Sequence, residues 1–290
     1  MRLEDILLRD PYVLFVNNTY YLYGSRNGNE EKEFYQNNLE VYKSKDLLEW
    51  SEGKSLLDIN EFDDKNVELW APEVYHYSGA FYMFVTMKVF EKGKETHRGT
   101  YVFASDTPDG EFRIHSPKAI TPENWECLDG SLYFENEEPY MIFCREWTQC
   151  GDGEICAVKM DNDLKKSVGE AKILFSASEA PWVCEYGDKK YVTDGPFLFK
   201  DKTDGTLYMI WSSFTANGYA VGMSYSPSNS IMGEWKQCDL PLFDKNGGHA
   251  MIFETMGNEL KIILHAPNDA PASPKILNFT RVKAGDYAVK

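Results

Sequence analysis

The sequence predicts an all-β fold, a five-bladed β-propeller whose four-stranded antiparallel blades surround a central channel. The first observation is a short apolar unit that recurs at residues 10–15, 71–75, 129–134, 194–199 and 249–253. The second observation is that a turn and another apolar strand follow each copy. Five copies in 290 residues give a spacing of about 58 residues, which is typical of propeller blades.

The other strands of each blade follow in order. Second strands are expected at residues 20–23, 81–84, 140–143, 207–210 and 260–264. Third strands are expected at residues 41–46, 102–106 and 221–225, with a weaker copy at 157–161. These runs are rich in Tyr, Phe, Val and Ile and are bounded by Gly, Asn, Asp and Pro, as strands are. No linker rich in Pro, Gly or Ser interrupts the repeats, so one domain over residues 1–290 is predicted.

The composition excludes several classes of protein. Hydrophobic residues make up 43% and aromatic residues 14% of the chain, which is too many for a disordered protein. The formal net charge of −16 argues against a nucleic-acid partner, because phosphate recognition needs clustered Lys and Arg. No apolar run is long enough to cross a bilayer, so no membrane partner is expected. The six cysteines form no CxxC pair and have no His cluster beside them, so a zinc site is not expected.

The first ten residues run directly into the first repeat and contain no apolar region of a signal peptide. A cytoplasmic location is therefore predicted, although a chain that had lost its leader would look the same. The sequence gives no indication of the oligomeric state.

Polar residues open four of the five repeats. Because the first strand of every propeller blade lines the channel, Asp10, Asp129, Asp194 and His249 are expected to converge. Asp is also common in turns, so any one of them could be structural. Carboxylates that converge repel each other, which separates their pKa values and favours acid–base chemistry. A divalent cation is the competing use of such a cluster.

Four segments, at residues 9–11, 70–74, 128–132 and 193–198, resemble the blade motifs of glycoside hydrolase family 43. The resemblance extends over roughly residues 8 to 268, with the blades in the correct order. It implies a five-bladed propeller that removes arabinofuranose or xylose units from fragments of plant polysaccharides. The implied partner is an oligosaccharide substrate. No cofactor is required, and the resemblance allows a calcium ion in the central channel near His249.

The resemblance also implies a role for each Asp. Asp10 corresponds to the general base, which activates water for a single displacement with inversion, and Asp129 orients the acid and raises its pKa. Asp194 stands where the family has a Glu as the general acid. Its side chain is shorter by about 1.5 Å, and a displacement of that size can reduce the rate on the order of 100-fold. Inverting enzymes tolerate carboxyl separations of about 6.5–9.5 Å, so a shifted backbone or sugar could absorb the difference.

Two alternatives to Asp194 as the acid therefore stay open: Glu179 or Glu185 could supply the proton, or the propeller could bind carbohydrate without cleaving it. Because related propeller families share the fold, a glycosidase with a different sugar specificity is a further alternative function. An α-L-arabinofuranosidase is favoured over a β-xylosidase, although the motifs do not separate them.

Sugar recognition needs aromatic platforms and hydrogen-bonding groups at the channel mouth. The residues predicted to bind substrate are Trp70, Glu73, Arg145, Trp147, Trp211 and His249. Phe34 and Trp182 are further candidates, whereas Trp50 and Trp235 are expected to pack inside blades. The polar segment at residues 90–99 is expected to be a solvated loop, with neither His97 nor Arg98 in a catalytic role.

Overall fold

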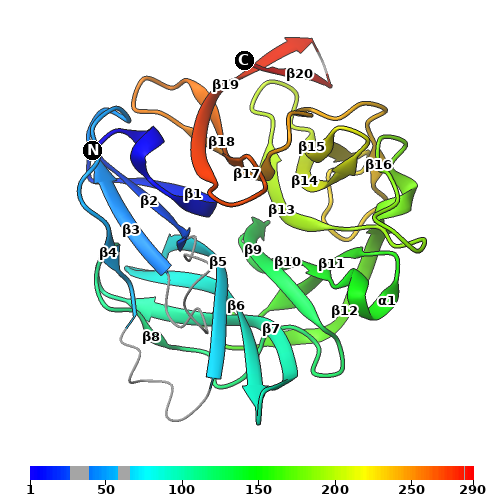
Figure 1. Ribbon diagram of the computed structural model, residues 1–290, viewed down its shortest axis with the longest axis horizontal. Coiled ribbons are helices and arrows are strands. Elements are labelled where there is room, and N and C mark those ends of the chain that lie inside the picture. Colours follow the sequence, from blue (N-terminus) through cyan, green and yellow to red (C-terminus); the bar gives the residue numbers. More distant parts are fainter. Residues whose placement is uncertain (27–38, 58–65, 284) are drawn as a thin grey trace.

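Five four-stranded sheets follow one another around a central axis in the computed structural model of the chain (Figure 1). The structure describes residues 1–26, 39–57, 66–283 and 285–290. In every sheet, strands that are consecutive in sequence are hydrogen-bonded neighbours and run antiparallel. The predicted five-bladed β-propeller is therefore confirmed.

Blades one to three each take four consecutive strands of the chain. Blade one comprises β1 (Leu8–Val16), β2 (Thr19–Arg26), β3 (Leu39–Ser44) and β4 (Lys54–Ser55). Blade two comprises β5 (Asn66–Tyr77), β6 (Ala80–Glu91), β7 (Lys94–Ser105) and β8 (Arg113–Ile114). Blade three comprises β9 (Cys127–Glu135), β10 (Glu138–Arg145), β11 (Glu154–Met160) and β12 (Ser167–Ser176).

The last two blades and the short helical segments complete the architecture. Blade four comprises β13 (Asp194–Lys200), β14 (Leu207–Thr215), β15 (Gly218–Ser226) and β16 (Lys236–Gln237). Blade five comprises β17 (Gly248–Glu254), β18 (Leu260–Ala266), β19 (Ser273–Lys283) and β20 (Asp286–Val289). The helical segments include η1 (Leu3–Asp5), α1 (Trp147–Cys150) and η3 (Ala177–Glu179). Within the described residues, no helix combines the length and apolar character needed to cross a bilayer.

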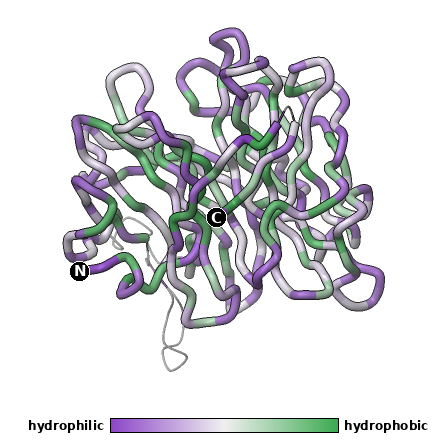
Figure 2. Tube along the Cα trace, turned by 90° about the horizontal axis from the view of Figure 1, so that it is seen from above, coloured by the Kyte–Doolittle hydropathy of each residue, from purple (hydrophilic) through white to green (hydrophobic). Residues whose placement is uncertain are grey.

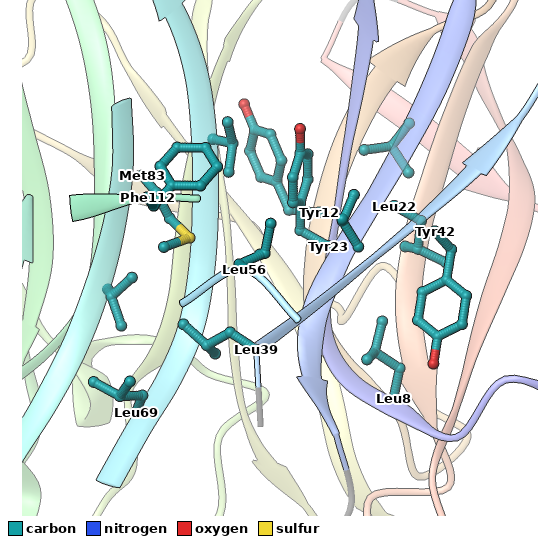
Figure 3. Packing of buried hydrophobic residues seen from close by; sticks show 14 of the residues in the cluster. Leu8, Tyr12, Leu22, Tyr23, Leu39, Tyr42, Leu56, Leu69, Met83 and Phe112 are labelled. Carbon is teal, nitrogen blue, oxygen red and sulfur yellow. The ribbon is translucent and has the colours of Figure 1, made fainter. Parts of the chain in front are cut away.

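The hydrophobic core lies within and between the blades. Figure 2 shows hydrophobic segments along the strands and hydrophilic residues on many of the connecting turns. Between blades one and two, Leu22, Leu56 and Phe112 pack in one buried cluster, with no exposed surface (Figure 3). Trp50 and Trp235 are buried as expected. This packing holds the first strands β1, β5, β9, β13 and β17 in a ring around the axis, where they contact one another.

Each first strand has a β-bulge at the same place. The bulge interrupts the pairing of each first strand with its second strand, and one residue there has a left-handed backbone. The left-handed residues are Asp10 (φ 52°), Ala71 (φ 49°), Asp129 (φ 58°), Gly195 (φ 50°) and His249 (φ 51°). Asp, His and Gly are among the residues that tolerate this conformation best, so the backbone favours these types at the channel.

The bulges correct the repeat alignment in blade four. Gly195, and not Asp194, occupies the position equivalent to Asp10 and Asp129. Asp194 is the last paired residue before the bulge, which makes it equivalent to Arg9 in blade one and Trp70 in blade two. Because the third and fourth copies both contain an Asp-Gly dipeptide, an alignment on Asp shifts the fourth copy by one residue.

The polar segment at residues 90–99 is also different from the expectation. Strands β6 and β7 extend through most of it and leave only Lys92 and Gly93 as a turn. Cross-strand pairs such as Lys88 with Arg98 continue the ladder to the end of the hairpin. The expected solvated loop is therefore wrong, because the backbone groups pair with each other. This hairpin brings Arg98 to the functional site.

Candidate active site

A cleft of about 560 Å³ lies where the first strands of the five blades meet. Its lining comes from every blade and includes Asp10, Trp70, Asp129, Asp194 and His249. These residues were predicted to line the site, and the structure brings them together. Arg98, Glu146 and Tyr219 also line the cleft, and sequence reasoning did not select them.

Asp10 is held by two histidines from blade five. Its Oδ1 atom lies 3.3 Å from Nδ1 of His249, and its backbone N–H donates to Nδ1 of His265 at 3.2 Å. Burial lowers the pKa of His265 to about 4, so its ring is neutral near pH 7 and can accept this hydrogen bond. The two contacts fix the Asp10 backbone in its left-handed conformation and aim its carboxyl group at the cleft.

The pKa of Asp10 is shifted downward. Burial alone raises the pKa of its carboxyl group, but the nearby His249, His265 and Arg9 side chains and a hydrogen bond from Ser25 outweigh that effect. Asp10 is therefore ionised at neutral pH. An ionised carboxylate in a cleft can accept a proton from water, which is the requirement for a general base.

Asp129 has a different environment at the equivalent place in blade three. Its Oδ2 atom accepts a hydrogen bond from the N–H of Gly195 at 2.9 Å and lies 3.7 Å from Nδ1 of His249. Burial and the charge of Asp10 raise its pKa well above the usual value, while the Gly195 N–H opposes the rise. Because Asp10 and Asp129 both approach the same His249 nitrogen, their titrations are coupled.

The pKa of Asp194 is shifted upward, in the opposite direction to that of Asp10. The hydroxyl of Tyr219 donates to its Oδ2 atom at 2.9 Å. Burial first, and then the carboxyls of Asp129 and Glu146, raise the pKa of Asp194 to about 8. Asp194 is therefore mainly protonated at neutral pH, as a general acid must be. One cleft thus holds an ionised carboxylate and a protonated one.

Arg98 and Glu146 form a buried ion pair in the wall of the cleft. Nη1 of Arg98 lies 2.7 Å from Oε2 of Glu146, and the same guanidinium also contacts Glu95. Burial raises the pKa of Glu146, and Arg98 opposes that shift. Alternation along the end of β10 could have suggested Glu146, because it shares a face with the buried Cys144 while Arg145 points the other way.

Two aromatic side chains stand at the cleft as predicted. Trp70 is half-buried, and Lys88 and Arg98 lie 5.3 Å and 5.4 Å from its ring centre. Trp147, the first residue of α1, contacts Tyr186 edge to face at a centroid distance of 5.7 Å. Both indole rings come from residues that line the cleft, so both can offer an apolar face to a sugar ring.

Three residues predicted to bind substrate lie elsewhere. Trp211 has no exposed surface and packs against Trp182 at a centroid distance of 4.8 Å, because it faces the interior of blade four opposite the bulge. Arg145 pairs with Glu154 at 3.1 Å, away from the cleft lining. Glu73 is buried and accepts a hydrogen bond from the Tyr75 hydroxyl instead of lining the cleft. The predictions for Trp211, Arg145 and Glu73 are corrected accordingly.

The two alternative acids are also outside the cleft lining. Glu179 is exposed and accepts the N–H of Ser176 at 2.8 Å, which caps η3. Glu185 is exposed and accepts the N–H of Lys189 at 2.8 Å. Both carboxylates stabilise local turns, so neither is placed to protonate a sugar in the cleft. Trp182 is buried in the core of blade four, and Phe34 lies outside the described residues.

The described residues contain no group of three or more His, Cys, Asp or Glu side chains arranged to hold a metal ion. Near His249, the Nδ1 atom of His265 is already used, because it accepts a hydrogen bond from the Asp10 N–H. The calcium ion that the resemblance allows stays an untested prediction.

Comparison with known proteins identifies a family. Residues 5–284 match the model of glycosyl hydrolases family 43. A solved endo-arabinase of Bacteroides thetaiotaomicron is 39% identical, with a TM-score of 0.87, and the match covers 99% of this chain and 98% of that one. An endo-1,4-β-xylanase of the same bacterium is 27% identical, with a TM-score of 0.78, and the match covers 98% and 94% of the two chains.

A curated relative is the extracellular exo-α-(1→5)-L-arabinofuranosidase of Cellvibrio japonicus. It is 22% identical over 268 residues, which are 84% of this chain and 68% of the relative. The predicted cytoplasmic location is contradicted by this relative, which is extracellular by name. The correction has a simple reason: a missing apolar leader at the start of a chain is weak evidence about its compartment.

Proposed function

Because the chain belongs to glycoside hydrolase family 43 and is a glycosidase, we propose that it hydrolyses α-L-arabinofuranosyl linkages in arabino-oligosaccharides with inversion. The observation that carries the proposal is that two carboxyl groups line one cleft, with the pKa of Asp10 lowered and that of Asp194 raised to about 8. The preference for arabinose is supported by the endo-arabinase, which is 39% identical to this chain.

In the proposed reaction, the ionised Asp10 carboxylate accepts a proton from a water molecule. The water oxygen attacks the anomeric carbon as the bond from that carbon to the leaving oxygen breaks. Asp194 donates its proton to the leaving oxygen, and the product sugar has the opposite anomeric configuration. Asp129 stays close to Asp194 through the Gly195 N–H and favours its protonated form. Each group makes one proton transfer in the chemical step, and exchange with solvent then returns Asp10 to its ionised form and Asp194 to its protonated form.

The oligosaccharide is held between the two sides of the cleft. Trp70 and Trp147 offer aromatic faces, and the Arg98–Glu146 pair offers charged groups that can bind sugar hydroxyls. A β-xylosidase activity is the second candidate, because an endo-1,4-β-xylanase is 27% identical over 98% of this chain.

A direct substrate comparison tests the proposal. The protein is incubated with α-1,5-linked arabino-oligosaccharides, β-1,4-linked xylo-oligosaccharides, an aryl α-L-arabinofuranoside and an aryl β-D-xyloside, and product release is followed by chromatography. We expect faster release from the arabinosides, with the β-anomer of arabinose appearing first by proton NMR. Faster release from the xylosides would favour the second candidate. Binding of oligosaccharides without any hydrolysis would replace the enzyme proposal with a carbohydrate-binding propeller.

The pH dependence of the reaction follows from the opposite pKa shifts of Asp10 and Asp194. Asp10 must be ionised, so kcat/KM is lost only as the pH falls through its pKa, which lies below the usual 3.8. Asp194 must be protonated, so kcat/KM is lost as the pH rises through its pKa of about 8. We expect a broad bell-shaped profile, measured from initial rates between about pH 3 and about pH 10. A decline of kcat/KM that began near pH 5 as the pH was raised would contradict the assignment of Asp194.

A further inference from the structure

Neighbouring blades are joined by a repeated hydrogen bond at the bulges. In four of the five junctions, the N–H of the left-handed residue donates to a side chain on the second strand of the preceding blade. The four pairs are Ala71 to Ser25 (3.0 Å), Asp129 to Thr86 (2.8 Å), His249 to Ser212 (2.8 Å) and Asp10 to His265 (3.2 Å). Each acceptor satisfies a buried N–H that the bulge removes from the strand ladder.

These acceptors occupy one equivalent position. Ser25, Ser212 and His265 pair across the sheet with the last residue before the bulge of their own blade, and so does Thr86. In blade three the equivalent residue is Cys144, which pairs with Leu128. A thiol is a weak hydrogen-bond acceptor. At this fifth junction the N–H of Gly195 donates instead to the carboxylate of Asp129, at 2.9 Å.

Cys144 is also close to the reacting groups. It has no exposed surface, and burial, followed by the charges of Asp129 and Asp194, raises the pKa of its thiol well above the usual value. The thiol therefore stays protonated and neutral behind both carboxyls. A hydroxyl at the same place would be an acceptor of the kind that Ser25, Thr86 and Ser212 provide at the other junctions.

We propose that Cys144 is a positioning residue for the glycosidase reaction: by not accepting the Gly195 N–H, it leaves that N–H to hold the Asp129 carboxylate beside Asp194. The catalytic consequence rests on the proposed function, while the hydrogen-bond exchange itself does not. An N–H donor stabilises the ionised form of Asp129. Burial raises the pKa of both Asp129 and Asp194, and a charge on either carboxyl raises the pKa of the other, so a donor that favours charge on Asp129 favours the proton on Asp194, where the reaction needs it.

A hydroxyl at position 144 should reverse this arrangement. In Cys144→Ser, the new Oγ accepts the Gly195 N–H and Asp129 loses its donor. Asp129 should then bind its proton more tightly, by about one pH unit, and Asp194 should lose its proton at lower pH. Cys144→Ala removes the thiol without adding an acceptor, so it should leave both titrations unchanged. Cys144→Thr copies Thr86 and provides a second variant with a hydroxyl.

The charged and titratable groups around this pair are common to all three variants. They are Asp10, Glu73, Arg98, Glu146, Tyr219 and His249. None of them is altered by the substitutions, so a shift that appears in Cys144→Ser and is absent from Cys144→Ala reports the change of hydrogen-bond acceptor.

The test is a titration of the Asp carboxyl carbons by carbon-13 NMR, in full-length protein labelled at Asp and checked for folding by its melting temperature. The Asp129 signal is assigned by its loss in Asp129→Asn. We expect the Asp129 titration to move upward by about one pH unit in Cys144→Ser and Cys144→Thr, and the basic limb of kcat/KM to move to lower pH. Unchanged titrations in both hydroxyl variants, or an equal shift in Cys144→Ala, would overturn the proposal.

The NMR result separates this proposal from the proposed function. A protein that hydrolysed no arabinoside could still show the Asp129 shift, which would leave the hydrogen-bond exchange intact and remove only its catalytic consequence. A protein that hydrolysed arabinosides but showed no Asp129 shift would overturn the proposed role of Cys144 and leave the proposed function intact.

Discussion

Asp10→Asn is expected to lower kcat on an arabino-oligosaccharide by about 10²–10⁴-fold, the usual contribution of a general base. The amide has nearly the shape of the carboxylate but cannot accept a proton from water. Asn also tolerates the left-handed backbone found at Asp10 (φ 52°), so this variant should keep its fold, whereas Asp10→Ala would add backbone strain. Initial rates and melting temperatures of the purified variant check both statements.

Glu179→Gln is the matched control for this change. It makes the same conversion of acid to amide at an exposed carboxylate that caps η3 and does not line the cleft. Its kcat should stay within a few-fold of the unmodified protein. Asp10→Asn with full activity and normal folding would show that another group activates the water.

Asp194→Asn is expected to have an effect of similar size that depends on the leaving group. With an oligosaccharide, whose leaving alcohol needs a proton, kcat should fall by about 10²–10⁴-fold. With a dinitrophenyl arabinoside, whose leaving group departs without protonation, the loss should be much smaller. The decline of kcat/KM near pH 8 should also disappear, because it comes from the Asp194 carboxyl, whose pKa is raised to about 8.

The two exposed candidates serve as controls for the acid. Glu179→Gln and Glu185→Gln should retain the basic limb and the activity on both substrates, since their carboxylates cap local turns. Equal losses on the oligosaccharide and the activated arabinoside in Asp194→Asn would argue against proton donation by Asp194. A large loss on the oligosaccharide with little loss on the activated arabinoside in Glu185→Gln would instead move the acid to that residue.

Asp194 and Asp10 occupy different backbone positions in their blades. Asp194 precedes the left-handed residue of its blade, whereas Asp10 and Asp129 are left-handed themselves. The residue before the bulge is also the position of Trp70, which lines the cleft. The Asp194 and Asp10 side chains therefore start from different backbone positions at the channel.

The strand order could be predicted because it follows from local sequence. Alternating apolar residues and turn residues recur in every blade, and antiparallel neighbours in a meander need no long-range information. The convergence of Asp10, Asp129 and His249 was predictable for the same reason, since the repeat places them on equivalent first strands.

The features of the site that could not be predicted from the sequence depend on contacts between blades. The position of Asp194 relative to the bulge could not be predicted from the sequence, because the same Asp-Gly dipeptide also occurs at Asp129. Hydrogen bonds across the blade junction select which residue of the dipeptide is left-handed. Arg98 and Glu146 meet only when the hairpin of blade two reaches blade three. Trp211 and Trp70 are both aromatic residues in strands, and only the bulge register places one in the core and the other at the cleft.

The left-handed bulges have a consequence for redesign of the propeller. Five backbone positions at the channel have φ near +50°, and few residue types adopt that conformation without strain. Gly, Asn, Asp and His adopt this conformation most readily, so these positions favour those four types whatever reaction is performed there, and of the five only Ala71 (φ 49°) lies outside that set. A library that varied these positions over all twenty residues would sample mostly strained proteins. Restricting it to those four types would keep the fold while moving acids, bases and amides among the blades.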